Sequence, residues 1–99
     1  MADLANDIRL AVDSGKAVFG VKESVDSIMA SKAKVVIVAS SNARDRLNDV
    51  MHLAKLSNVK LVVFQGNPMN LGVVCGKPYS VSVLSIMEAG SSNILKENY

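Results

Sequence analysis

The sequence predicts an α/β fold, a three-layer α/β/α sandwich around a four-stranded sheet. Stretches with apolar residues at helical spacing alternate along the chain with short β-branched runs, a pattern typical of strands connected by helices. Two of these runs, Val35–Ala39 and Leu61–Phe64, are apolar without a break, as expected for strands covered on both faces. With 99 residues and a hydrophobic fraction of 49%, the chain has the size and composition of one domain, residues 1–99.

The first half of the chain predicts two helices with a short strand between them. Asp3 is expected to cap the first helix, and Ser14-Gly15 to end it with the glycine in the left-handed conformation. Lys16–Phe19 is expected to be extended, and Gly20 to turn the chain into the second helix. Apolar residues three or four apart mark the inner faces: Leu4, Ile8, Ala11 and Val12, then Val21, Val25, Ile28 and Met29.

The second half predicts two more helices and the last strands. Asn42 can cap a third helix, with Asp45 three residues on as in a capping box. Asn67 and Pro68 are the residues preferred at the cap and first position of a fourth helix, which Gly76 ends. The inner faces are Leu47, Val50, Met51 and Ala54, then Leu71, Val74 and Cys75, and the last strand is expected over Val81–Ile86.

Charge and cysteine content exclude several classes of protein. The net charge of +2 is too small to indicate nucleic-acid binding by itself, and a single cysteine excludes an internal disulfide. Neither a signal peptide nor a bilayer-spanning run is present, so we expect a soluble, intracellular protein with no membrane partner. From Val50 to Met87 there is no Asp or Glu, which buried strands explain in part and a positive potential on exposed loops in part.

Enzyme chemistry finds little support. One histidine and one cysteine cannot form a metal cluster, and His52 is most simply a solvated helix residue. Cys75 is most simply a buried small side chain, with a catalytic pairing of the thiol and His52 as the alternative. Gly72–Pro78 resembles a phosphate-binding loop, but its glycines are one residue too close and Pro78 replaces the magnesium-binding hydroxyl. We therefore expect no enzyme activity, no cofactor and no metal.

Three loops carry residues suited to binding anions. Gly20-Val21-Lys22-Glu23 opens a helix, whose N-terminal N–H groups attract negative charge. Ser40–Arg46 opens another helix, where Asn42 either caps the helix or presents its amide to a base edge or a phosphate. Arg44 and Arg46 are cations near the start of this helix, where acidic residues are usual. In Gly76–Tyr79, the tyrosine either stacks on an unpaired base beside Lys77 or packs at a strand edge. Together these loops fit RNA better than a metabolite.

At this point the chain resembles the ribosomal protein L30e family of archaeal and eukaryotic large subunits, within the L7Ae superfamily of kink-turn RNA binders. The order and spacing of several short stretches over nearly the whole chain carry the resemblance. They are Ser14–Lys16, Phe19–Lys22, Val35–Ala39, Leu53–Ser57, Phe64–Asn67, Leu71-Gly72, Gly76–Pro78 and Val83–Gly90. The resemblance implies a mixed sheet and an RNA site built from the three loops above.

The resemblance also assigns individual residues. Gly20 and Lys22 match family positions that contact RNA, and Glu23 resembles the second residue of an Asn-Glu pair whose Asn is Lys22 here. Tyr79 matches the aromatic position that stacks on RNA, and Val81 matches the apolar contact just beyond it. Lys77 matches the basic residue that flanks this position. In the second loop the family has Asn directly after the strand, where a gapless comparison places Ser41, so either Ser41 or Asn42 is expected to make that contact.

We therefore expect a structural constituent of the large ribosomal subunit that binds a kink-turn or internal-loop element of rRNA. Lys22, Arg44, Arg46 and Lys77 are expected to neutralise phosphates. Neighbouring ribosomal proteins and other kink-turn RNAs are further expected partners, and the free protein is expected to be a monomer located in the cytoplasm, on the ribosome. The alternatives are a kink-turn binder acting outside the large subunit and a protein-interaction adaptor that binds no RNA.

Overall fold

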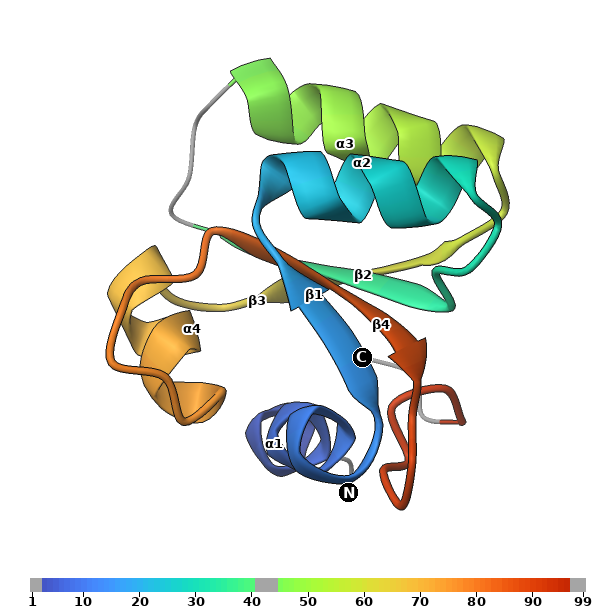
Figure 1. Cartoon of the computed structure of the whole chain (residues 1–99). Coiled ribbons are helices and arrows are strands. Elements are labelled where there is room, and N and C mark those ends of the chain that lie inside the picture. Colours follow the sequence, from blue (N-terminus) through green and yellow to red (C-terminus); the bar gives the residue numbers. More distant parts are fainter. Residues whose placement is uncertain (1–2, 41–44, 97–99) are drawn as a thin grey trace.

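The computed structural model describes residues 3–40 and 45–96, and for residues 45–47 the backbone alone. The elements follow in the order α1 (Leu4–Ser14), β1 (Lys16–Phe19), α2 (Val21–Met29), β2 (Val35–Ala39), α3 (Asp45–Leu56), β3 (Lys60–Phe64), α4 (Pro68–Val74) and β4 (Val83–Glu88). Figure 1 shows α2 and α3 over one face of the sheet and α1 and α4 over the other. The predicted three-layer α/β/α sandwich is therefore confirmed.

The sheet has four strands in the order β1-β4-β2-β3. β4 is antiparallel to both of its neighbours, whereas β2 and β3 are parallel, so the sheet is mixed as expected. In this arrangement β1 and β2 end, and β4 begins, at the same end of the sheet (Figure 1). That end carries the loops which the sequence analysis singled out.

Two buried apolar clusters fill the space between the sheet and its helices. Alternate residues of a strand point to opposite faces, so β2 sends Val35 and Ile37 into one cluster and Val36 and Val38 into the other. The helices complete them, with Ile8, Ala11, Leu71 and Cys75 on the side of α1 and α4, and Ile28, Val50 and Ala54 on the side of α2 and α3. All five residues of β2 are buried, which confirms its predicted cover on both faces.

The other apolar run behaves differently. We predicted that Leu61–Phe64 would also be covered on both faces, but Val62 is buried while Val63 is exposed. β3 lies at the edge of the sheet, with β2 as its single neighbour among the described strands. An edge position leaves one flank of the strand open, so a continuous apolar run is not sufficient evidence for a central strand.

Most of the predicted helix boundaries are confirmed. The left-handed conformation predicted for Gly15 and the inner position predicted for Met29 are wrong. Asp3 caps α1, and Asn67 caps α4 in a reciprocal capping box with Asn70. Gly15 ends α1 in an extended conformation, not the left-handed one; glycine is needed there because a Cβ would collide with the carbonyl oxygen of Glu88. Met29, predicted on the inner face of α2, is 73% exposed.

Serines take the inner positions of α2 that the apolar pattern did not indicate. Ser24 and Ser27 are buried beside Ile28. The Ser27 hydroxyl lies within hydrogen-bonding distance of the Ser24 carbonyl oxygen and, at 2.8 Å, of the Ser85 hydroxyl on β4. The hydroxyls of Ser27 and Ser85 satisfy each other and are therefore buried at little free-energy cost, whereas the buried Ser24 hydroxyl has no hydrogen-bond partner among the described residues.

The last strand begins later than predicted, at Val83 rather than Val81. The N–H of Val81 donates to the carbonyl of Pro68 at 2.9 Å, so this part of the chain is attached to α4 and not to the sheet. Among residues 3–40 and 45–96, no helix has both the length and the apolar character that crossing a membrane requires.

Candidate nucleic-acid interface

The sheet brings the separate loops together at one of its ends. The N–H of Gly20, directly after β1, donates to the carbonyl of Val83 at 2.9 Å. The N–H of Ala39, at the end of β2, donates to the carbonyl of Ser82 at 3.0 Å. The loops that follow β1 and β2 therefore lie beside the loop that precedes β4, as the sequence analysis expected.

A fourth loop, which the sequence analysis did not include, joins this end. Ser40 N–H donates to the Phe64 carbonyl at 2.8 Å, and Gly66 N–H donates to the Ser40 hydroxyl at 3.1 Å. The signal for this loop was available, because parallel strands joined by a helix end at the same edge of a sheet. We call this end the loop rim; its described parts are Gly20–Glu23, Ser40, Gln65–Asn67 and Lys77–Ser82.

The first part of the loop rim presents backbone and charge without obstruction. Gly20 has a φ of +100°, which favours glycine, and a Cβ built there would meet nothing within 4 Å. Gly20 has no side chain to cap α2, so among the described residues the first N–H groups of this helix have no side-chain cap. Lys22 and Glu23 in that first turn are both exposed.

The segment between α4 and β4 presents the aromatic ring. Tyr79 lies in a loop and is 50% exposed, as a stacking role requires and a packed strand-edge position does not. Gly72 lies against the carbonyl of Tyr79 so closely that a Cβ would collide with it. The absence of a side chain at Gly72 therefore fixes the distance between this loop and α4.

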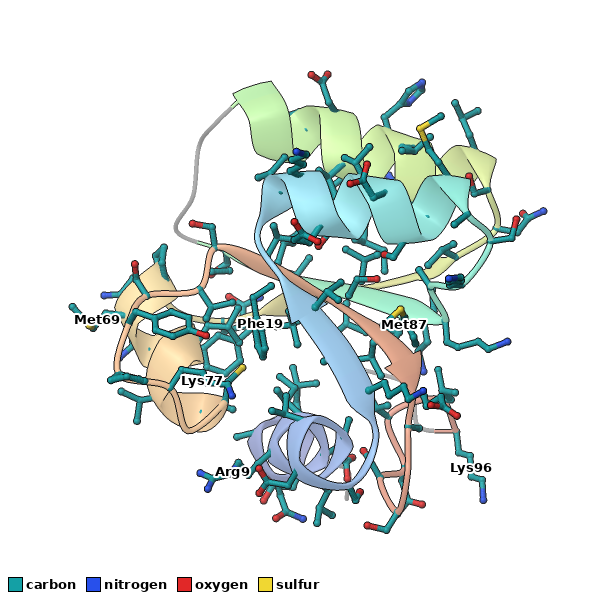
Figure 2. All side chains as sticks on the ribbon, viewed as in Figure 1. Arg9, Phe19, Met69, Lys77, Met87 and Lys96 are labelled. Carbon is teal, nitrogen blue, oxygen red and sulfur yellow. The ribbon has the colours of Figure 1, made fainter. Side chains whose placement is uncertain are left out.

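Lys77 is placed by a ring contact. Its ammonium nitrogen lies 5.3 Å from the centroid of the Phe19 ring, a cation–π geometry, and Figure 2 shows the two side chains together. Phe19 is the last residue of β1 and directly precedes Gly20. The Phe19 ring packs against the cluster under α1 and α4, so the contact holds the charge of Lys77 on that side of the sheet, next to the strand that leads into Gly20.

The remaining predicted residues divide into a buried one and several that lack a described side chain. Val81 is 3% exposed and belongs to the core cluster under α1 and α4, so its side chain offers no surface to a ligand. Asn42 and Arg44, like Ser41, lie outside the described residues. Arg46 lies in the first turn of α3, and its side chain is also outside the described part.

The residues considered for catalysis are far from forming a site. Cys75 is buried, and burial raises the pKa of its thiol from 9.0 to about 11, although Lys77 and Arg9 oppose the rise. His52 is exposed on α3, on the opposite face of the sheet from the cluster that holds Cys75. His52 is therefore not placed to act as a base for the thiol. Within residues 3–40 and 45–96, no three His, Cys, Asp or Glu side chains are grouped to hold a metal ion.

Comparisons with known proteins agree with this architecture. Residues 2–96 match the ribosomal protein L7Ae/L30e/S12e/Gadd45 family. The chain is 42% identical over 89 residues to large ribosomal subunit protein eL30 of Saccharolobus solfataricus, covering 90% of this chain and 82% of that protein. It is 38% identical to eL30 of Methanothermobacter thermautotrophicus, covering 95% and 96%.

A solved structure with little sequence similarity has the same fold. It is described as a protein with unknown function from Bacillus halodurans, and it superposes with a TM-score of 0.80 at 20% identity, over 96% of this chain and 94% of that one. The likeness extends to the whole three-layer sandwich.

Proposed function

Because the chain belongs to the ribosomal protein L7Ae/L30e/S12e/Gadd45 family, we propose that it is a structural constituent of the large ribosomal subunit and binds a kinked, internally looped element of rRNA through the loop rim. The observation that carries the proposal is the convergence of four loops at one end of the sheet, with Lys22, Lys77 and Tyr79 presented there. The protein acts by binding and not by catalysis. Its location is the cytoplasmic ribosome, and its neighbours there include other ribosomal proteins.

Phosphate binding uses the first part of the rim. The unshielded N–H groups at the start of α2 and the Lys22 ammonium can both approach one phosphate, since Gly20 leaves the space in front of them open. Lys77 adds a second cation on the α1 and α4 side of the sheet, held by the Phe19 ring. Each phosphate that a cation neutralises releases counterions, so affinity falls as salt rises.

Base recognition uses the third loop. A regular A-form helix hides its base edges in a deep, narrow groove, whereas a kink with an internal loop exposes unpaired bases. The half-exposed ring of Tyr79 can stack on one of these bases. We leave Val81 out of the proposed contact surface because its side chain is buried, and we retain Asn42, Arg44 and Arg46 as contacts from the second loop.

A titration with two RNAs tests the proposal. One RNA contains a kink-turn, and the other is a straight duplex of the same length and charge. We expect the kink-turn to bind at least about tenfold more tightly at physiological salt, because only the kink presents unpaired bases. Equal affinity for the two RNAs would contradict the proposal, and binding of neither RNA would leave the adaptor function.

Association with the ribosome is a separate test of the cellular role. A tagged copy expressed in its own host should cosediment with large subunits and leave them when the salt is raised. Recovery with small RNAs and without subunits would instead indicate a kink-turn binder acting elsewhere. We propose that the purified protein, free of RNA, is a monomer, which sedimentation analysis checks.

A further inference from the structure

The outer face of α4 is unusually apolar for a solvent-exposed helix. Met69 is 63% exposed and Val73 is 68% exposed, and their spacing of four residues places them on the same side of the helix. Figure 2 shows Met69 projecting away from α4. We call Met69, Val73 and Tyr79 together the α4 face. None of its three members is needed to fill the core.

The α4 face is continuous with the loop rim because the following loop runs along the helix. The N–H of Lys77 donates to the Gly72 carbonyl, and the N–H of Val81 donates to the Pro68 carbonyl, both at 2.9 Å. Tyr79 lies between these two attachments, with its carbonyl against Gly72. The loop that carries the ring proposed to stack on RNA is therefore attached to the same short helix that exposes Met69 and Val73.

The charge around the α4 face favours a polyanion. No Asp or Glu occurs from Val50 to Met87, a stretch that includes β3, α4 and the loops on either side of the helix. Near the helix, the ammonium of Lys77 lies over the Phe19 ring, and the guanidinium of Arg9 of α1 lies against Gly76 at the end of α4. Arg9 also pairs with the carboxylate of Asp13 on α1, at 2.8 Å, which neutralises part of its charge. A phosphate chain can thus approach α4 without meeting a negative charge on the helix.

We propose that the α4 face is a second RNA contact, which packs against unpaired nucleotides that leave the kinked element beside Tyr79. This inference rests on the proposed function and extends its site. Paired strands turn their sugars and phosphates outward, so an apolar surface gains contact with RNA only where bases are unpaired. Base faces of any sequence fit such a surface, so the contact adds affinity without sequence preference.

The test uses one kink-turn RNA in two forms: blunt at both ends, or with a short unpaired strand at each end. The variant carries Met69→Gln and Val73→Thr, which keep approximate size and remove apolar surface from exposed positions. We expect the wild-type protein to bind the extended RNA more tightly than the blunt one. The variant should bind the extended RNA about fivefold more weakly and the blunt RNA less than about twofold more weakly.

A matched control exists at the other end of the molecule. Met29 and Leu56 are 73% and 69% exposed, on α2 and α3, so Met29→Gln with Leu56→Thr removes similar apolar surface far from the loop rim. We expect this control to bind both RNAs as the wild type does. Thermal unfolding of both variants checks that they remain folded.

The outcomes separate the two proposals. If the wild type gains nothing from the unpaired extensions, or if the variant weakens both RNAs equally, the α4 contact is refuted while kink binding stands. A loss in the Met29 and Leu56 control as large as in the variant also refutes it, since the effect would then not depend on place. If the blunt RNA is bound no better than a straight duplex, the proposed function itself fails. If the Met69 and Val73 substitutions change neither RNA affinity, the α4 contact with RNA is refuted, and a ribosomal protein becomes the remaining partner for this face.

Discussion

The two ends of the sheet are built differently, although both consist of turns between helices and strands. At the far end, α2 and α3 lead into β2 and β3 through Ser31 and Asn58, which adopt φ values of 59° and 58°. Each of these turns forms hydrogen bonds with the helix that precedes it. The Ala33 N–H donates to the Ser27 carbonyl at 3.1 Å, and the Val59 N–H donates to the Ala54 carbonyl at 2.9 Å. At the loop rim Gly20 has a φ of +100°; two further glycines with positive φ, Gly76 after α4 and Gly90 after β4, lie outside the rim.

The difference shows which end is adapted to receive a ligand. The turns at Ser31 and Asn58 keep residues with side chains in a left-handed conformation, so local hydrogen bonding is enough to hold them. A Cβ at Gly20 would meet none of the described residues within 4 Å, so packing among them does not explain its small size. Its conformation and the open space in front of it leave the start of α2 accessible, as binding of a phosphate requires.

The largest effect is expected where the loop rim is attached to α4. Gly72→Ala would place a Cβ into the carbonyl of Tyr79, and both groups belong to backbone that cannot move independently. We expect the free energy of unfolding to fall by about 2–3 kcal/mol, measured by urea denaturation. The exposed neighbour gives the comparison, because Val73→Ala should change it by no more than about 0.5 kcal/mol. Equal effects of the two changes would mean that this attachment is loose.

Cys75, at the end of α4, reports on the packing beneath the same loop. Burial raises the pKa of its thiol from 9.0 to about 11, so the folded protein holds its proton more tightly than the unfolded chain does. Stability from this source is complete below pH 9 and is lost as the pH rises toward 11. We expect the free energy of unfolding to fall by about 2 kcal/mol between pH 9 and pH 11, relative to the change in the Cys75→Ala variant. A parallel pH dependence of the two proteins would show an exposed thiol, as would rapid alkylation at neutral pH.

Exchanging the kinds of residue used at the two ends tests the contrast in their turns. Gly20→Ala should lower the free energy of unfolding by about 1–3 kcal/mol through backbone strain alone, since the added methyl group has space. Ser31→Gly at the far end removes the strain of a side chain at positive φ, but it also raises the conformational entropy of the unfolded chain. These two effects oppose each other, so the free energy of unfolding should change by no more than about 1 kcal/mol. Chemical denaturation measures both. If Gly20→Ala were neutral, its unusual conformation would not be needed for the fold.

Removing an exposed apolar side chain from each end tests where RNA binds. Tyr79→Ala should weaken binding of a kink-turn RNA by about 1–3 kcal/mol, the range for loss of a stacked base, with little change in stability. Met29→Ala removes an even more exposed side chain at the far end and should leave the affinity unchanged. Fluorescence anisotropy titrations give both numbers. Similar losses from the two variants would mean that the interface is not restricted to the loop rim.

Much of the fold could be predicted from the sequence because the deciding signals are local. Asp3 and the Asn67-Pro68 pair act on the helix that follows them, and the apolar run of β2 directly reflects its burial. The errors concern properties set by distant partners. β3 is as apolar as a central strand but lies at an edge, and Gly15 is required by Glu88, which lies at the other end of the sequence.

The candidate site shows the same division. Lys22 and Tyr79 could be proposed as candidates from residue type and position, because a cation in a helix's first turn and an aromatic ring in a loop are visible in sequence; the structure shows that both are exposed. The burial of Val81 and the position of Lys77 over Phe19 depend on the path of the loop along α4, which no local pattern gives. The loop around Gly66 escaped attention because its place at the rim follows from strand direction and not from its own composition.

The smallest expected effect concerns single charges at the two ends. Lys22 lies in the first turn of α2 at the loop rim, and Lys34 lies just before β2 at the far end; both are exposed. If Lys22 neutralises one phosphate, Lys22→Ala should reduce the slope of log affinity against log salt by about one and weaken binding only severalfold at physiological salt. Lys34→Ala removes the same charge and should leave the slope unchanged, because exposed charges separated by more than a Debye length are screened. Equal reductions in slope would show that the RNA responds to total charge and not to the rim.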